Sequence, residues 1–331
     1  MNPLQRIGIA AFLCALSFPL HGMAMSSEQA MAGTEPSAAA EPYRQPLSDA
    51  WWTGPLLAAG GATLPRGRML IEPYFYDVRG SHANSFGSSS YVLYGATPWL
   101  TVGTIPAVGY NKLSNAPSSS AMGAGDFTLV AEHQLTQFHP GRWMPTMGAI
   151  VEETLPTGKY DKLGERPSNG LGAGAYTTLV GLYPQTYFWM PNGHILRMRF
   201  DLSQSFSRSV NVEGVSVYGT GAEFSGRARP GASFLADPAW EYSVTRRWVL
   251  ALDAAYRHNW NTRVTGVDAI PAGGGLGVTM NSGSSEVFAF APAIEYNWKS
   301  YLGVIVGTRV IPPSHNNKET ITPVMAINFV H

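Results

Sequence analysis

Charged side chains occur at alternate positions within several apolar stretches of this chain. Arg197, Arg199 and Asp201, for example, alternate with methionine and phenylalanine. Carboxylates and guanidinium groups can bind polar or charged solutes, and they can also pair with one another and stiffen a narrow interior. Both interpretations remain open at this point. The charged residues in this alternating pattern are Glu72, Asp126, Glu132, Glu152, Arg197, Arg199, Asp201, Asp237, Glu241, Asp253, Arg257, Glu295 and Arg309.

No motif among these residues indicates catalysis. The eight histidines are scattered, and none has a second ligand at the spacing of a metal site. The stretch from Gly170 to Gly174 lacks the strand–helix context of a nucleotide-binding loop. We therefore predict no enzymatic activity and no cofactor, with a membrane-embedded enzyme as a less favoured alternative. Basic and acidic residues number 22 each, so the basic excess of a nucleic-acid-binding protein is missing.

The alternation itself indicates β-strands, because successive side chains of a strand point to opposite faces of the sheet. A shift of one residue would exchange arginines and leucines between the faces, so each register is well determined. A tilted strand crosses a membrane with about 9 to 11 residues, and most of these segments reach that length. The twelve predicted strands cover residues 68–77, 88–96, 99–110, 124–136, 144–156, 172–189, 194–206, 231–244, 247–258, 285–297, 300–311 and 319–330.

The connections between these strands alternate in length. Short connections are expected at residues 97–98, 138–142, 190–193, 245–246 and 299. Long connections are expected at residues 78–87, 111–123, 157–171, 207–230, 259–284 and 312–318. Outer-membrane barrels have tight periplasmic turns on one side and long extracellular loops on the other. A soluble exported β-sandwich, the alternative, has no reason to alternate in this way.

Aromatic residues lie on the apolar face, and most are close to a strand end. The tryptophans among them cluster beside the short turns, as the aromatic girdles of a membrane barrel do. The alternative is the general preference of aromatic residues for strands. Residues assigned to this face include Trp99, Tyr110, Trp143, Tyr187, Trp189, Trp240, Tyr242, Trp248, Tyr256, Tyr296 and Trp298.

The first 24 residues have the three-part layout of a cleaved secretory signal peptide. A short basic start precedes an apolar run at residues 7–20, and small residues lead up to Ala24. The only cysteine, Cys14, lies in the apolar run behind Leu13, which disfavours a lipidation site. No later stretch is long enough for a spanning helix, so a membrane-crossing chain must form a closed barrel.

Two segments separate the signal peptide from the first strand. Residues 25–47 are rich in Ala, Ser, Glu and Pro and are predicted to be a flexible periplasmic segment. Residues 48–67 are apolar but interrupted by glycine and proline, which predicts an irregular segment. Such a segment could fold into the lumen as a plug, since irregular backbone at membrane depth requires protein or water around it. A loose tether, or packing against the rim, is the alternative. The candidate plug residues are Trp51, Trp52, Pro55, Leu56 and Leu57.

Several stretches resemble the proteobacterial outer-membrane family named for the meta-pathway of phenol degradation. The stretches are Thr53-Gly54-Pro55-Leu56-Leu57, Thr63-Leu64-Pro65-Arg66-Gly67, Ile71-Glu72-Pro73-Tyr74, Gly125-Asp126-Phe127-Thr128-Leu129 and Glu153-Thr154-Leu155-Pro156-Thr157-Gly158-Lys159-Tyr160. The resemblance implies a barrel distantly similar to the outer-membrane fatty-acid and aromatic-hydrocarbon transporters. It implies small hydrophobic or aromatic cargo and supplies no catalytic residue. One departure is the C-terminus, which ends Phe329-Val330-His331 where such barrels usually end on an aromatic residue.

The combined prediction is an all-β protein, a transmembrane antiparallel up-and-down β-barrel of about 12 strands over residues 68–331. We expect it in the outer membrane of a Gram-negative bacterium, as a porin-like channel for passive passage of small, hydrophobic or aromatic molecules. The expected partners are outer-membrane lipid, the barrel-assembly machinery and the small-molecule cargo, with no nucleic acid. The main alternative is a structural or adhesive barrel with a closed lumen.

Overall fold

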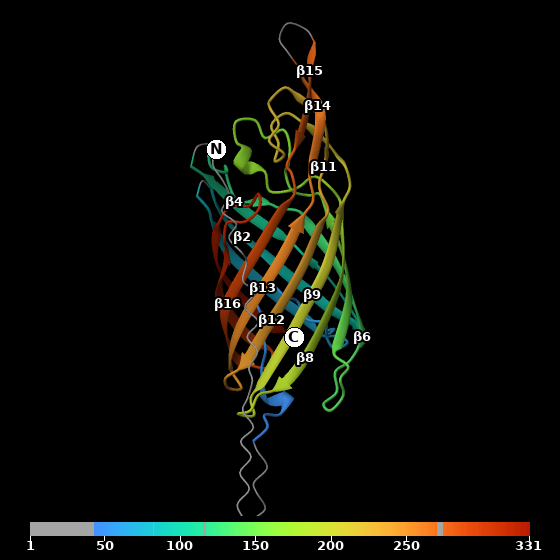
Figure 1. The fold of residues 1–331 in the computed structure, drawn as a ribbon, viewed down its shortest axis with the longest axis vertical. Helices are drawn as coiled ribbons and strands as arrows, with labels where there is room; N and C mark the ends of the chain where they lie inside the picture. Colours follow the sequence, from blue (N-terminus) through green and yellow to red (C-terminus); the bar gives the residue numbers. More distant parts are fainter. Residues whose placement is uncertain (1–42, 82, 115–116, 270–273) are drawn as a thin grey trace, which may run out of the picture. The chain divides into compact units, whose positions relative to one another are not determined.

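Twelve long antiparallel strands form a closed barrel (Figure 1). The computed structural model describes residues 43–81, 83–114, 117–269 and 274–331, so the predicted signal peptide and residues 25–42 lie outside the described part. The barrel strands are β1 (Met69–Arg79), β2 (Ala83–Thr97), β3 (Leu100–Ile105), β6 (Phe127–Thr136), β7 (Thr146–Leu155), β8 (Thr177–Trp189), β9 (Ile195–Ser207), β12 (Ser233–Ser243), β13 (Trp248–Asn259), β16 (Ser285–Lys299), β17 (Leu302–Ile311) and β18 (Thr320–Val330).

Two further pieces extend this wall. β4 (Ala107–Leu113) continues β3 beyond Pro106, and β5 (Gly123–Ala124) lies just before β6. Each strand pairs with its neighbours in chain order, and β1 pairs with β18, for example Ile71 with Phe329. Because the barrel is closed, no strand edge is left with unpaired backbone groups. A sheet must meet this requirement to lie in lipid, where no water can pair with those groups. The predicted antiparallel barrel of about twelve strands is therefore confirmed.

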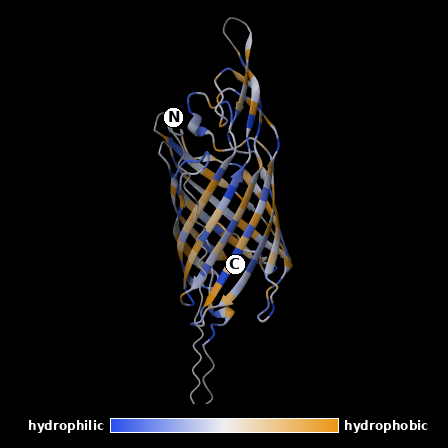
Figure 2. Ribbon diagram, viewed as in Figure 1, coloured by the Kyte–Doolittle hydropathy of each residue, from blue (hydrophilic) through white to orange (hydrophobic). Residues whose placement is uncertain are grey.

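The two faces of the wall differ as the alternation predicts. On β13, Trp248 and Leu250 are each 48% exposed on the outside, whereas Val249 and Asp253 are fully buried on the inside. Figure 2 shows hydrophobic and hydrophilic residues alternating along the barrel strands. A continuous exposed apolar belt is unfavourable in water and favourable in lipid. Other large apolar residues of the belt include Val102, Leu129, Val151, Phe200, Phe290, Ile294 and Val306.

None of the helices in the described residues is long and apolar enough to cross a membrane. The helical content is two short 3-10 turns, η1 (Leu47–Asp49) and η2 (Pro167–Asn169), within those residues.

Three of the predicted long loops are wrong in detail. β1 and β2 pair up to Arg79 and Asn84, so residues 78–87 are mostly strand and the connection is short. The loops at 207–230 and 259–284 contain a second sheet, in the order β10 (Val210–Glu213), β11 (Phe224–Arg229), β14 (Arg263–Ala269) and β15 (Gly275–Asn281). β11, β14 and β15 project beyond the barrel at the end with the long loops (Figure 1). These strands are only four to seven residues long, and three of them contain glycine, so their periodicity is weak.

Two aromatic assignments to the lipid face are also wrong. Tyr187 lies in phase with the buried Tyr183 and Gln185, and Gln185 donates a hydrogen bond to its hydroxyl. Trp189 donates its indole N–H to the carbonyl of Gln45 at 2.8 Å. Both rings therefore contact the inside of the wall or the N-terminal segment. Each is amphipathic, so an aromatic residue near a strand end does not by itself identify the face.

Candidate functional site in the barrel lumen

The segment from residue 43 to residue 67 enters the barrel at the short-turn end. The side chain of Gln45 is its first anchor and is almost completely buried. Its amide nitrogen donates to Ser243 Oγ at 2.9 Å, and its amide oxygen accepts from the backbone of Ile195 at 3.1 Å. Gln45 thus makes buried contacts with the barrel wall, although it belongs to the stretch 25–47 that is predicted to be flexible.

The segment then rises along the wall formed by β9, β12, β13, β16 and β17. The Thr53 N–H donates to Glu295 at 2.6 Å, and Asn297 donates to the carbonyl of Trp51 at 3.1 Å. Irregular backbone has unpaired amides, so a wall that carries acceptors is needed to hold it away from water.

Asp253 binds the main chain of the segment at residues 56–58. Its carboxylate accepts from the backbone N–H groups of Leu56 at 3.0 Å, Leu57 at 3.3 Å and Ala58 at 2.9 Å. The Leu56 side chain is buried against Ala293 and other small residues of the wall. Three donors to one carboxylate are strong, charge-assisted interactions. They account for a fully buried aspartate in the middle of a barrel wall.

The segment next crosses the lumen and returns to the short-turn end. The Ala59 N–H donates to Asp201 at 2.7 Å, and Arg199 donates to the carbonyl of Ala58 at 2.9 Å. On the opposite wall, the Thr63 N–H donates to Gln134 at 3.1 Å and the Leu64 N–H to Thr101 at 2.8 Å. The side chains of both walls thus bind the main chain of one hairpin-like segment.

Gly61 lies where this segment passes closest to the wall. A Cβ atom there would be 1.9 Å from the carbonyl oxygen of Tyr183, whereas a Cβ at Gly60 would have its nearest contact at 3.4 Å. We expect Gly61→Ala to displace the segment at a cost of about 1–3 kcal/mol, the usual cost of overpacking. Limited proteolysis of the folded barrel should then cut within residues 57–64. Gly60→Ala is the matched control and should stay resistant; equal resistance of both variants would contradict this packing.

Next to Trp52 of the segment, buried ion pairs join two arginines of β9 to Glu241 of β12. Arg197 forms a two-pronged ion pair with Glu241, and Arg199 Nε lies 3.1 Å from the same carboxylate. The ring of Trp52 covers the Arg197 guanidinium at 4.5 Å, within cation–π range. These three charged residues therefore pair with one another.

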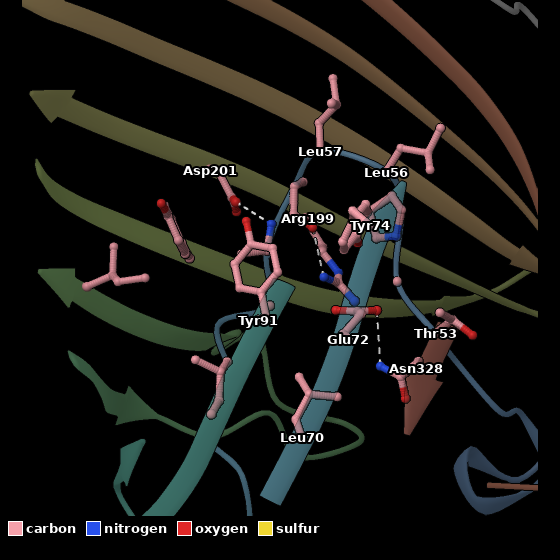
Figure 3. Close-up of a pocket in the computed structure, with 18 of the residues that line it drawn as sticks. Thr53, Leu56, Leu57, Leu70, Glu72, Tyr74, Tyr91, Arg199, Asp201 and Asn328 are labelled. Carbon is pink, nitrogen blue, oxygen red and sulfur yellow. Dashed lines mark hydrogen bonds between the residues drawn. The ribbon is translucent and has the colours of Figure 1, made fainter. Parts of the chain in front are cut away.

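The segment leaves a cavity of about 790 Å³ beside it. One side of the cavity is formed by Leu56, Leu57 and Ala59 of the segment, and the other side is the wall of the remaining strands. Figure 3 shows the side chains of Glu72, Tyr74, Tyr91, Arg199 and Asp201 gathered around this space. Glu72 accepts a hydrogen bond from Asn328 at 3.1 Å. The lining extends from Leu70 and Val330 near one barrel end to Val78 and Arg309 farther up, so the cavity runs along the lumen.

The structure places the predicted charged residues in four different environments. The cavity is lined by Glu72, Glu132, Glu152, Arg197, Arg199, Asp201, Arg257 and Arg309. The N-terminal segment or a neighbouring ion pair covers Glu241, Asp253 and Glu295, while Asp237 is fully buried in the wall. Asp126 lies at the long-loop end, where its carboxylate accepts from the backbone of Gly158 and Ala173.

Charge alone did not identify every lining residue. Tyr74, Tyr91 and Tyr183 line the cavity, as do Gln185 and Thr322. Each lies in phase with a charged residue of its own or a neighbouring strand, so the strand register contains the signal for them. The inward phase therefore indicates uncharged lining residues as well as charged ones. Among the described residues, no three His, Cys, Asp or Glu side chains gather as metal ligands would.

The Asp126 contacts join two stretches that carry the family resemblance. Gly125 accepts a hydrogen bond from the Thr157 hydroxyl at 3.0 Å, and Asp126 accepts from the Gly158 N–H at 2.9 Å. Residues 125–129 and 153–160 therefore meet at the long-loop rim, where they fix the loop that follows β7. Their role in this structure is to shape the barrel mouth.

Comparison with known proteins gives a structural likeness and no sequence family. No family model and no curated protein matches the sequence. An outer-membrane channel from Pseudomonas putida F1 is similar with a TM-score of 0.58 and 16% identity, over 82% of this chain and 97% of that one. The NanC porin has a TM-score of 0.42 and 10% identity over 78% and 98% of the two chains. The Pseudomonas putida toluene transporter TodX has a TM-score of 0.37 and 14% identity over 86% and 94%.

The first of these structures shows that the chain has the fold of an outer-membrane β-barrel. The closed barrel and its exposed apolar belt agree with that fold. The protein is therefore located in the bacterial outer membrane, as its alternating strands predict.

Proposed function

We propose that the protein is a passive outer-membrane channel for small molecules. The observation that carries the proposal is the cavity of about 790 Å³ that runs along the lumen beside the N-terminal segment. A barrel that served only as a rigid structural element would have no need to leave this space open. The first structural relative is itself described as an outer-membrane channel, which supports the same function here.

The N-terminal segment acts as a fixed partial plug in this proposal. It narrows the lumen to a cavity of the size of a single small ligand, since ligand pockets commonly have volumes of about 300–1,000 Å³. The many hydrogen bonds from Asp253, Asp201 and Gln134 to its main chain support a stationary position. Selectivity then depends on the residues that line the remaining space.

The cargo in this proposal is a small organic molecule with an aromatic or apolar part. Support comes from the tyrosine and leucine side chains of the lining, among them Tyr74, Tyr91, Tyr183 and Leu179. The resemblance to the family named for phenol degradation agrees with such cargo. The proposal includes no catalytic step, and assembly into the membrane would use the general barrel-assembly machinery.

Swelling of proteoliposomes in neutral sugars tests the channel function. Vesicles that contain the purified, folded protein should swell in arabinose, and swelling should slow as the sugar grows from a mono- to a trisaccharide. Protein-free vesicles are the control for leakage through lipid. Equal swelling with and without protein would contradict an aqueous path and favour a closed, structural barrel.

A further inference from the structure

Six charged residues of the cavity lining have no opposite charge within 4.0 Å among the described residues. Two of them, Glu72 and Asp201, accept hydrogen bonds from Asn328 and from the Ala59 N–H. The other four are Glu132, Glu152, Arg257 and Arg309. Glu132 Oε1 and Arg309 Nε are also buried without any hydrogen-bond partner in that part of the chain. Burial of an unpaired charge is unfavourable unless something binds it. These residues are therefore available to a bound solute, unlike Arg197 and Glu241.

The two signs lie on opposite walls. Around the ring of twelve strands, β7, which carries Glu152, is six strands away from β17, which carries Arg309, in either direction. β6, which carries Glu132, is five strands from β13, which carries Arg257. All four residues border the same cavity. A solute inside it therefore has the Glu132 and Glu152 carboxylates on one side and the Arg257 and Arg309 guanidinium groups on the other.

Nearby acids do not cancel the basic wall. Asp253 and Asp201 accept backbone N–H groups of the N-terminal segment. Asp237 interacts electrostatically with Arg257 but is not part of the cavity lining and forms no ion pair within 4.0 Å in the described residues. Within the cavity lining itself, β12, β13, β16, β17 and β18 contribute the two arginines Arg257 and Arg309 and no acidic side chain, so the surface that faces a solute there is basic.

Aromatic side chains occupy the arc between the two walls. β18, β1, β2 and β3 lie between β17 and β6 in the ring. Tyr74 on β1 and Tyr91 on β2 line the cavity there, with their ring centroids 5.8 Å apart in an edge-to-face arrangement. Leu56 and Leu57 of the N-terminal segment also line the cavity, and they belong to the same apolar cluster as Tyr74. An apolar or aromatic body would pack against this combined surface.

We propose that the lumen selects small zwitterions with an aromatic or apolar body. The ammonium group of the solute lies toward Glu132 and Glu152, and its carboxylate lies toward Arg257 and Arg309. This inference rests on the proposed channel function and names its substrate class. Selection arises because a solute with one charge would satisfy only one wall and leave the other unpaired.

Block of the channel current by three related solutes tests the inference. The probes are L-phenylalanine, N-acetyl-L-phenylalanine, which lacks the positive charge, and L-phenylalanine amide, which lacks the carboxylate. Each is titrated against the potassium chloride current of the intact protein in a planar bilayer. L-phenylalanine should reach half-block at a concentration at least about fivefold lower than either analogue, since a charge-assisted hydrogen bond contributes at least this factor.

Substitutions of similar size assign the effect to the two walls. The double variant Glu132→Gln and Glu152→Gln should weaken block by L-phenylalanine but not block by the acetylated acid, an anion that these carboxylates repel. Arg257→Gln with Arg309→Gln should weaken block by L-phenylalanine but not block by the amide, a cation that these guanidinium groups repel. Glu223→Gln and Arg227→Gln, at exposed positions in the long-loop region, are matched controls. Folding of each variant is checked by the change in its gel migration on heating. If a double variant does not fold, the single variants Glu152→Gln and Arg257→Gln replace it in the block measurements.

The outcomes separate this inference from the channel function. A stable current that all three probes block equally would overturn the zwitterion selectivity and leave the channel in place. A preference for L-phenylalanine that survives both pairs of substitutions would also overturn it. Absence of both current and sugar swelling would overturn the channel and, with it, the selectivity.

Discussion

Deletion of residues 51–66 should increase the single-channel conductance at least several-fold. These residues occupy the lumen next to the cavity of about 790 Å³ and contact both walls. Their removal leaves the β-barrel strands and all of their pairings intact, since β1 begins at Met69. Conductance rises with the cross-section of the water-filled path, so an emptied lumen should conduct much more.

The matched control for this deletion keeps the segment but loosens its attachment. Asp253→Asn retains the size of the side chain and removes the charge that three backbone N–H groups share. We expect this variant to show intermittent openings toward the conductance of the deletion variant. Equal conductance of wild type and deletion variant would mean that the segment does not limit the path.

Replacement of Glu241 by alanine should cause the largest loss of barrel stability of any single lumen substitution. It leaves the Arg197 and Arg199 guanidinium groups buried without their carboxylate. Removal of one partner from a buried ion pair costs about 3–5 kcal/mol. The temperature at which the folded barrel shifts its migration in a detergent gel should fall markedly.

The exposed ion pair between Lys162 and Glu213 is the control for the Glu241 variant. Its N–O distance of 2.7 Å is close to the 2.6 Å between Arg197 Nε and Glu241. It lies in the long-loop region, however, and both side chains are more than half exposed. Solvent screens such a pair, so Glu213→Ala should leave the unfolding temperature nearly unchanged. A similar loss in both variants would contradict the assigned role of Glu241.

The barrel could be predicted because each strand needs apolar side chains toward the lipid and can carry polar side chains only toward the lumen. On β13, Trp248 and Leu250 alternate with Val249 and Asp253, and only one register puts the aspartate inside. Membrane crossing also sets a minimum strand length, which makes each segment long enough to recognise. Both constraints act locally, so a single strand contains the information.

The lumen was less predictable because its organisation depends on contacts between distant residues. Glu241 and Glu132 have the same alternating pattern in sequence, yet one is paired with two arginines and the other has no ion-pair partner among the described residues. Glu241 is the cross-strand partner of Arg197, whereas Glu132 lies opposite Thr101 and Ile150. Contacts with the N-terminal segment join residues that are farther apart still, since Asp253 is separated from Leu56 by 197 positions in the chain. No periodicity within a strand reports such a contact.

The sheet of β10, β11, β14 and β15 was missed for a different reason. Its strands lie above the membrane-spanning part, so they have neither the required length nor a lipid-facing side. Gly226 and Gly266 pair with each other in the middle of β11 and β14, and a Cβ on either would contact its neighbour at less than 3 Å. Glycine in a strand usually indicates a loop in sequence, although here it allows close backbone approach.

The central claim is that cargo passes through the cavity beside the N-terminal segment, and neighbouring serines on β2 test it most directly. Ser89 lines the cavity, whereas Ser90 is the next residue and points to the other face of the wall. The only natural cysteine is Cys14, within the predicted signal peptide. Single-channel current of the mature Ser89→Cys and Ser90→Cys variants is recorded before and after a charged, water-soluble thiol reagent. We predict a stepwise fall in current for Ser89→Cys alone. An unchanged current in Ser89→Cys, or an equal fall in Ser90→Cys, would contradict this path.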